Sequence, residues 1–272
     1  MKVLYKRSVA FVLTVVIAFS FLSLVSVKGK EARYSSYGDP MTYALKETET
    51  ISYTRREENY FETEKGVPKY VQYAQYPNSC GPVAGSIIVG FYDKYYEELI
   101  PNYNPTFSNG SYRKEDSVYI PQLTGELYTL MRTNVDDIGV SETDCLNGLR
   151  TYVQNKGRSL TYVNLYGMNG INVNSYQIAV DNNRPSLIFC SKISVYNFYY
   201  DPNADILSIL TYEGGHVLVA YGYYEVNYYS TSGLFRTDKY LAVSTGLEGI
   251  SGYLKLDDNV GWCTAAYAVA VD

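Results

Sequence analysis

Two residues of this 272-residue chain have the types and surroundings of a nucleophile and its base. Cys80 lies in "QYPNSCGPVAG", between a polar turn and an apolar run, and His216 is the only histidine. Because Ser79 is a favoured N-cap residue, the sequence predicts a helix that begins at Cys80. The unpaired N–H groups and the dipole at a helix N-terminus favour the thiolate form of cysteine. A thiolate with an imidazole nearby is an activated nucleophile.

His216 directly follows Gly214 and Gly215, at the start of a predicted strand. Glycines at this place let the backbone come close to a ligand and let the histidine face a cleft. The competing interpretation is an ordinary surface or core histidine without a chemical task. The presence of Cys80 favours the chemical interpretation, because a cysteine and a histidine far apart in sequence can meet in a folded hydrolase.

The other three cysteines, Cys145, Cys190 and Cys263, show no comparable pattern. Their spacings are wide, the chain has no CxxC pair, and a single histidine cannot complete a Cys/His zinc cluster with them. The sequence therefore predicts no metal site and no cofactor. An even number of cysteines invites disulfides outside the cell, so buried thiols and disulfide partners both remain open for these three residues.

The segments around the two candidate residues predict helices first and strands last. The helix that begins at Cys80 carries an apolar or aromatic residue at every fourth position: Val83, Ile87, Phe91 and Tyr95. Further helices are expected over residues 120–133, 141–157 and 173–183, and strands over 159–167 and 184–193. Four later runs predict an antiparallel meander: residues 216–226, 239–245, 252–257 and 265–271. This order indicates an α+β fold with an N-terminal helical half packed on a C-terminal antiparallel β-sheet.

The chain divides into three parts by composition. Residues 1–28 join a basic start to an uninterrupted apolar run, which predicts a signal peptide or a retained N-terminal anchor. Residues 29–66 are polar with mixed charges and are interpreted as a linker or pro-segment, with a short strand or helix packed on the domain as the alternative. Residues 67–272 form the predicted domain. The protein is expected to be secreted, with membrane contact only through its N-terminal segment.

Charge and tyrosine content limit the classes of partner. A net charge of −5 argues against a nucleic-acid-binding protein, whose footprint would be a basic patch. The 32 tyrosines suit half-buried strands and wet surfaces, because the ring is apolar and the hydroxyl needs a partner. A β-rich extracellular domain explains them, and a sugar- or peptide-binding face is the alternative. The sequence makes no prediction of oligomeric state.

Three blocks of this sequence carry a family resemblance. "VPKYVQYAQYPNSCGPVAGSIIVGFYDKYY" resembles the start of a C39-like peptidase domain of the papain-like cysteine protease superfamily. "GGHVLVAYGY" resembles the histidine block of such domains, and "KYLAVSTGLEGISGYLKLDD" resembles the last hairpin of streptopain-type proteases. The resemblance covers residues 67–272. It implies a papain-like cysteine hydrolase fold, with the nucleophile at the N-terminus of a central helix.

The same resemblance implies catalytic roles. Cys80 matches the nucleophile and His216 the general base. Gln72 matches the side chain that stabilises the oxyanion, with Gln75 as the rival, and the Cys80 N–H is the second donor. The family's third position, an Asn or Asp that orients the histidine, falls on Ser244 and Thr245 here.

The missing carboxylate or amide at the third position leaves several functions open. Ser244 is the candidate third residue, while Asp238 or Asp257 would have to reach in from neighbouring loops. The first expectation is a secreted cysteine peptidase that cleaves peptide or related amide bonds through an acyl-enzyme, with a peptide or protein as substrate. The second is a catalytically weak or inactive papain-like domain that binds peptide or cell-wall material. A small-molecule amide or acyl transferase is the third, since fold does not fix function.

Overall fold

The computed structural model describes residues 33–34, 45–107, 112, 118–135, 139–247, 250–257 and 259–272. These residues belong to one unit, Ala32–Asp272. The predicted signal peptide or anchor, residues 1–28, lies outside the described residues. Within the described ranges, no helix combines the length and the apolar character needed to cross a bilayer.

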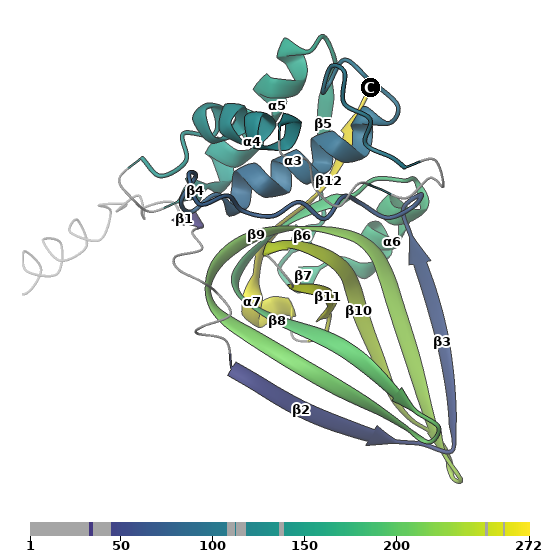
Figure 1. Cartoon of the computed structure of the whole chain (residues 1–272). Helices are drawn as coiled ribbons and strands as arrows, with labels where there is room; N and C mark the ends of the chain where they lie inside the picture. The colour runs from purple at the N-terminus through teal and green to yellow at the C-terminus, as the bar shows by residue number, and fades with distance from the viewer. Residues whose placement is uncertain are drawn as a thin grey trace, which may run out of the picture. The chain divides into compact units, whose positions relative to one another are not determined.

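Helices α4 and α5 lie beside a central helix, α3, whereas α6 and α7 lie apart from it (Figure 1) and pack in the core on the other face of the large sheet. Their bounds are α3 Cys80–Asp93, α4 Tyr119–Leu130, α5 Glu142–Asn155, α6 Val173–Asp181 and α7 Asn259–Trp262. Every residue of α3 is buried, because α4 and α5 pack on it and strands β9 and β10 lie against it as well. The predicted helical pattern of apolar and aromatic residues extends one turn too far, to Tyr95. The helix ends at Asp93, and Tyr95 beyond it is largely exposed.

The strands of the described residues form one large antiparallel sheet and two small two-stranded ones. The large sheet runs in the order β2 (Leu45–Ser52), β9 (Ala204–Ser230), β10 (Gly233–Leu247), β11 (Ile250–Lys255), β8 (Ser186–Asp201), β12 (Cys263–Val271) and β5 (Leu160–Asn164), and β3 (Arg55–Glu62) also pairs with β9. The small sheets pair β1 (Arg33–Tyr34) with β4 (Val140–Ser141), and β6 (Tyr166–Gly167) with β7 (Gly170–Ile171). The chain is thus a mixed α and β protein built on an antiparallel sheet.

The predicted four-strand meander is only partly present. β9, β10 and β11 are consecutive antiparallel neighbours, but β12 leaves β11 and lies between β8 and β5. β12 is buried along most of its length. A buried strand needs partners for the N–H and C=O groups on both of its edges, and β8 and β5 supply them.

Residues 45–62 fold as two strands of the large sheet rather than as a linker, which is the packed alternative that the sequence left open. β2 pairs along its whole length with residues 204–211 of β9, and β3 with residues 222–229. Their sequence lacks an apolar alternation because most of their side chains are exposed on both faces. Ile51 is the buried apolar residue among the described side chains of these two strands.

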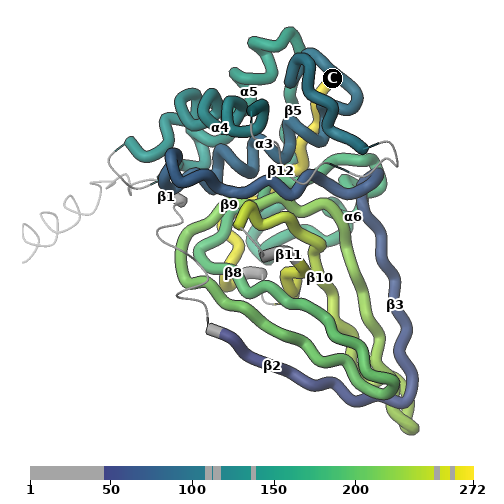
Figure 2. The backbone as a smooth tube through the Cα atoms, in the orientation of Figure 1, coloured from purple at the N-terminus to yellow at the C-terminus, as the bar shows by residue number. Residues whose placement is uncertain are grey.

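The turn between β2 and β3 connects the ends of two long hairpins (Figure 2). The Tyr53 N–H donates to the Asn203 carbonyl in the β8–β9 turn at 3.0 Å, and the Thr54 N–H donates to the Tyr229 carbonyl near the β9–β10 turn at 2.8 Å. β9 is 27 residues long, and its two halves have different outer neighbours, β2 and β3. The β2–β3 hairpin therefore joins the two arms of the sheet.

Two of the three hydrophobic cores among the described residues lie on opposite faces of the sheet, and β9 contributes to all three. Val217 and Val219 pack in the core that α3, α4 and α5 share, whereas Leu218 and Ala220 pack in the core beside α6. Successive side chains of a strand point to opposite faces, so His216 has the same orientation as Leu218. β9 reads as a continuous apolar run here because both of its faces are covered.

Asp93, the last residue of α3, is a buried carboxyl group with one unsatisfied oxygen. Its Oδ1 accepts the Ile100 N–H at 2.7 Å, and Oδ2 has no hydrogen-bond partner in the described part of the chain. Burial, and to a smaller extent the charges of Glu97 and Glu98, raise the pKa of Asp93 to about 7, although the hydrogen bond from the Ile100 N–H lowers it. Because the folded-state pKa lies above the unfolded value, the folded protein is most stable where Asp93 is protonated in both states, and stability falls as the pH rises from about 4 to 7.

Replacing Asp93 with asparagine is expected to flatten this dependence and to make the variant more stable than the parent at pH 8. Thermal unfolding followed by circular dichroism between pH 4 and pH 8 measures the difference between the two proteins at each pH. Asp181→Asn is the matched control, since Asp181 is exposed at the end of α6. A parent protein whose melting temperature exceeds that of D93N more at pH 8 than at pH 4 would contradict the assignment.

Candidate active site

Cys80 is the first residue of α3 and is 1% exposed. Ser79 occupies the N-cap position, as the sequence predicts, but its hydroxyl makes no capping hydrogen bond. It points instead to the side chain of Gln72, with 3.5 Å between Ser79 Oγ and Gln72 Oε1. The residue before the candidate nucleophile thus contacts the candidate oxyanion donor.

Gly81 allows the start of α3 to lie directly against β4 and α5. A Cβ atom at this position would come within 2.6 Å of Val140 Cγ1 and 3.5 Å of Cys145 Sγ, so any side chain would force these elements apart. A charged Cys80 is one of the causes that raise the pKa of the Cys145 thiol, after burial. Cys145 is therefore a buried neighbour of Cys80 and behaves as a core thiol.

His216 is fully buried in β9 and is held by a main-chain carbonyl. Its Nε2 lies 2.7 Å from the Thr245 oxygen. A carbonyl oxygen only accepts, so Nε2 carries the proton in this contact and Nδ1 of the neutral ring is the acceptor. Nδ1 is buried and has no hydrogen-bond partner among the described residues. Burial lowers the pKa of His216 to about 4, so the ring is neutral at pH 6.

Gln72 links the start of α3 to the turn that holds His216. Its N–H donates to the Gly246 carbonyl at 3.1 Å, one residue beyond Thr245. Gly246 has a φ of +74°, and a Cβ atom there would lie 3.0 Å from Val83 Cγ1 in the first turn of α3. The structure thus gathers Gln72, the Ser79–Cys80 step and the Thr245–Gly246 turn at one end of α3.

Cys190 gives a second connection between Cys80 and His216. Cys190 in β8 lies directly opposite His216 in β9. Burial raises the pKa of the Cys190 thiol, and negative charge on Cys263 and on Cys80 raises it further. Cys80 is therefore electrostatically coupled to the residue beside His216.

The remaining predicted residues do not join this group through the contacts seen. Gln75 is exposed, whereas Gln72 is partly buried. The Ser244 hydroxyl donates to the Pro68 carbonyl at 3.1 Å, so it is engaged away from the His216 ring. Asp238 binds Arg236 and Lys255, and Asp257 is exposed near Lys255.

The group that orients His216 is the Thr245 main-chain carbonyl, which sequence reasoning missed. The predicted third position supplied side chains, Ser244 and Thr245, and the carbonyl of Thr245 takes the contact with the ring. The Thr245 hydroxyl accepts the Leu247 N–H at 3.1 Å. The β10–β11 register shifts between Ser244 and Leu247, and this irregularity turns the backbone at the place where the ring is bound. The run Ser244-Thr245-Gly246 near the end of a strand is the sequence feature that could have indicated an irregular backbone here.

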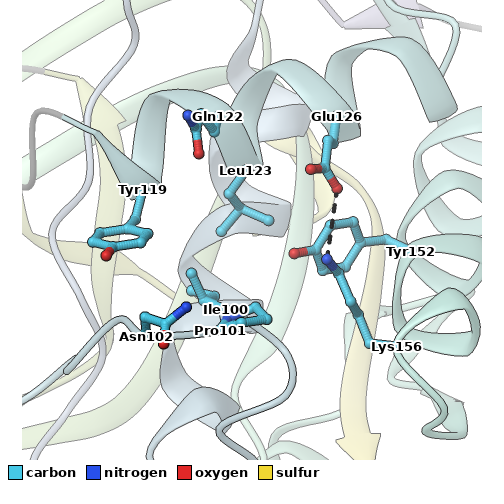
Figure 3. A pocket seen from close by; sticks show the side chains of 9 residues that line it. All are labelled: Ile100, Pro101, Asn102, Tyr119, Gln122, Leu123, Glu126, Tyr152 and Lys156. Atoms are coloured by element: carbon cyan, nitrogen blue, oxygen red, sulfur yellow. Dashed lines mark ion pairs between the residues drawn. The ribbon is translucent and has the colours of Figure 1, made fainter.

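A pocket lies elsewhere, between residues of α4 and α5 and the segment around Ile100 (Figure 3). The Ile100 N–H donates to Asp93, the last residue of α3, so the pocket is near the end of α3 that is opposite Cys80. It has a volume of about 270 Å³ and is lined by Ile100, Pro101, Asn102, Tyr119, Gln122, Leu123, Glu126, Tyr152 and Lys156. Glu126 and Lys156 face each other across it at 3.9 Å. The helix α3 spans roughly 20 Å, so this pocket is remote from Cys80. It contains none of the predicted catalytic residues.

Among the described residues, no three His, Cys, Asp or Glu side chains lie close enough together to hold a metal ion. Compared with models of known protein families and with curated proteins, the chain matches none.

Proposed function

We propose that this protein is a secreted cysteine peptidase of the papain-like type, which cleaves peptide or related amide bonds. The observation that supports the proposal is how the His216 ring is bound and which of its nitrogens can accept a proton. Its Nε2 is fixed by the Thr245 carbonyl, which leaves the buried Nδ1 as the base. The end of the helix that carries Cys80 is tied to the same turn through Gln72.

In the conformation seen, the His216 ring has the orientation of Leu218, toward the core beside α6, whereas Cys80 packs in the core of α3, and Nδ1 has no hydrogen-bond partner among the described residues. The proposed reaction therefore requires the Cys80 thiol and the ring to move together. The Cys80 sulfur then attacks the substrate carbonyl while His216 Nδ1 takes the thiol proton. The tetrahedral oxyanion accepts hydrogen bonds from the Cys80 N–H and the Gln72 amide group. The Ser79 hydroxyl donates to Gln72 Oε1, so the Nε2 donor of the same amide points away from Ser79. His216 then gives the proton to the leaving amine, and a water molecule deprotonated by His216 hydrolyses the thioester.

A first test is alkylation of Cys80 by iodoacetamide at pH 6, where ordinary thiols react slowly. A Cys80 thiolate would favour the protonated His216 ring and so raise its pKa above the value of about 4 that burial gives it. Through this pair Cys80 is expected to react at least about tenfold faster than a buried core thiol, and His216→Ala is expected to remove the difference. Peptide mapping by mass spectrometry after short exposure gives the rate for each cysteine. Cys145 is the internal control, since it is equally buried and lies beside the same helix turn.

Access to Cys80 is a separate variable in this measurement. β1 pairs with β4, whose Val140 packs on Gly81, and β1 also lies close to β8 and β9. We propose that β1, which lies within the predicted linker or pro-segment of residues 29–66, restricts access to the site. A chain that begins at Leu45 should then label faster than the full chain. Equal rates of Cys80 labelling in both forms would contradict the pro-segment role. If Cys80 is labelled no faster than Cys145 in either form, the peptidase proposal is wrong.

Gln72 and Gln75 give a paired prediction about the oxyanion. Gln72→Ala is expected to lower kcat on a peptide substrate by about 10²–10³-fold, the cost of one oxyanion donor. Gln75→Ala should leave kcat within about twofold, because its side chain is exposed. Steady-state kinetics with an internally quenched peptide measures both. The reverse order would assign the role to Gln75.

A peptide-binding module is the second candidate, and burial favours it. Cys80 and His216 are 1% and 0% exposed, so neither meets solvent in the conformation seen. A domain that only binds peptide would keep its affinity in a Cys80→Ala variant and show no turnover in the parent. Isothermal titration with the same peptide, beside the kinetic assay, separates the two functions.

A further inference from the structure

Cys190 and Cys263 lie directly opposite each other on neighbouring antiparallel strands. Cys190 is in β8, and Cys263 is the first residue of β12. Directly opposed residues of an antiparallel pair have Cα atoms about 4.5–5.5 Å apart. A disulfide needs a Cα separation of about 4.4–6.8 Å, so the backbone already provides the required spacing.

The two side chains also share a face of the sheet. Both belong to the core beside α6, whereas Cys80 and Cys145 belong to the core on the opposite face. Both thiols are free in the structure, and a charge on Cys263 raises the pKa of Cys190, which places the sulfur atoms within electrostatic range of each other. Cys190 therefore has one partner that combines position, orientation and proximity.

The backbone is irregular at both cysteines. The β8–β12 register shifts between Cys263 and Ala265, and the β8–β9 register shifts between Cys190 and Lys192. Cys263 also follows α7 without an intervening loop. A strand irregularity lets the local backbone adjust by small amounts, which a disulfide dihedral near 90° requires.

We propose that Cys190 and Cys263 are a modification site, at which a low-molecular-weight disulfide such as oxidised glutathione converts the two thiols into one disulfide. One cysteine thiolate attacks the glutathione disulfide and releases one glutathione thiolate. The second cysteine attacks the mixed disulfide and releases the other. Two protons and two electrons pass from the protein to the glutathione pair, and one S–S bond forms in the protein.

The site is coupled to folding because both thiols are buried, at 0% and 2% exposure. Burial raises the pKa of Cys263 to about 12, which leaves little thiolate to start the exchange in the folded protein. Oxidation is therefore expected to be fast during refolding and slow in the native state. The disulfide would close the loop Ser191–Trp262 and would lie beside His216, the strand neighbour of Cys190. The proposal holds whether or not the protein is a peptidase.

The test is refolding of the full chain from denaturant, once with a mixture of oxidised and reduced glutathione and once with dithiothreitol. After alkylation and non-reducing peptide mapping, the oxidised sample should contain a Cys190–Cys263 cross-linked peptide and two of the four cysteines alkylated. Its melting temperature should exceed that of the reduced sample by about 5–15 °C. Cys190→Ser and Cys263→Ser should each lose the cross-link and the shift, whereas Cys145→Ser should keep both.

Two outcomes overturn the proposal. One is full alkylation of all four cysteines after oxidative refolding to the native circular dichroism spectrum. The other is a predominant cross-link that contains Cys80 or Cys145. Both are read from the unsubstituted protein, so the test does not depend on the folding of any variant. A catalytically inactive protein with the cross-link would contradict the proposed function and leave this site in place.

Discussion

Replacing Cys80 with alanine is expected to abolish peptide hydrolysis, with a loss of at least about 10⁴-fold in kcat. His216→Ala should lose about as much, because a nucleophile without its base, or a base without its nucleophile, leaves only binding and oxyanion stabilisation. Residues that act as one unit have non-additive effects, so the double variant should be no worse than either single variant. Kinetics of the three variants with one internally quenched peptide tests this.

The matched control is Cys145→Ala, which removes a buried thiol beside the same turn of α3 and leaves the proposed chemistry intact. Its kcat should stay within about threefold of the parent value. A double variant that loses the product of the two single losses would mean that Cys80 and His216 act independently. A Cys80→Ala variant that keeps its activity would remove Cys80 from the reaction altogether.

The sequence singles out the side chains of this candidate site, but it does not single out the group that binds the His216 ring. Cys80 and His216 stand out through their residue types and their glycine and turn neighbours, and Gln72 through the family resemblance of the block that begins at Val67-Pro68. The contact to Nε2 comes from the Thr245 carbonyl, and every residue has a carbonyl. Only the path of the backbone decides which carbonyl meets the ring. The irregular register after Ser244 determines that path here.

The fold shows a similar division between local and non-local information. Caps and periodicity predict local elements well, and α5 begins as expected, with the Ser141 hydroxyl accepting the Asp144 N–H at 3.0 Å. The partners of β12 and the strands β2 and β3 depend on pairing between residues distant in sequence. β2 and β3 have mostly exposed side chains, so their backbone hydrogen bonds to β9, rather than apolar burial, place them in the sheet. The pattern of charged and turn residues in the sequence does not predict such hydrogen bonds.

A buried carboxylate explains why these polar strands stay on the sheet. Asp205 in β9 is 0% exposed and accepts hydrogen bonds from three donors. These are Arg56 Nε of β3 at 2.7 Å, Tyr228 Oη of β9 at 2.8 Å and Tyr53 Oη of the β2–β3 turn at 3.2 Å. The Arg56 side chain is itself only 12% exposed. Asp205 therefore ties both arms of the sheet to the β2–β3 turn through one charged group.

Replacing Asp205 with alanine is expected to lower the free energy of unfolding by about 3–5 kcal/mol, because it leaves the Arg56 guanidinium buried without this partner. Urea unfolding followed by circular dichroism measures the loss. Glu213→Ala removes an exposed carboxylate of the same strand and should change stability by less than about 0.5 kcal/mol. A loss below about 1 kcal/mol in D205A would mean that Glu58, which also pairs with Arg56 at 2.5 Å, compensates for the missing group. A large loss that disappears in the double variant Asp205→Ala, Arg56→Met would instead assign the cost to the unpaired charge, since only then does removing the guanidinium restore stability.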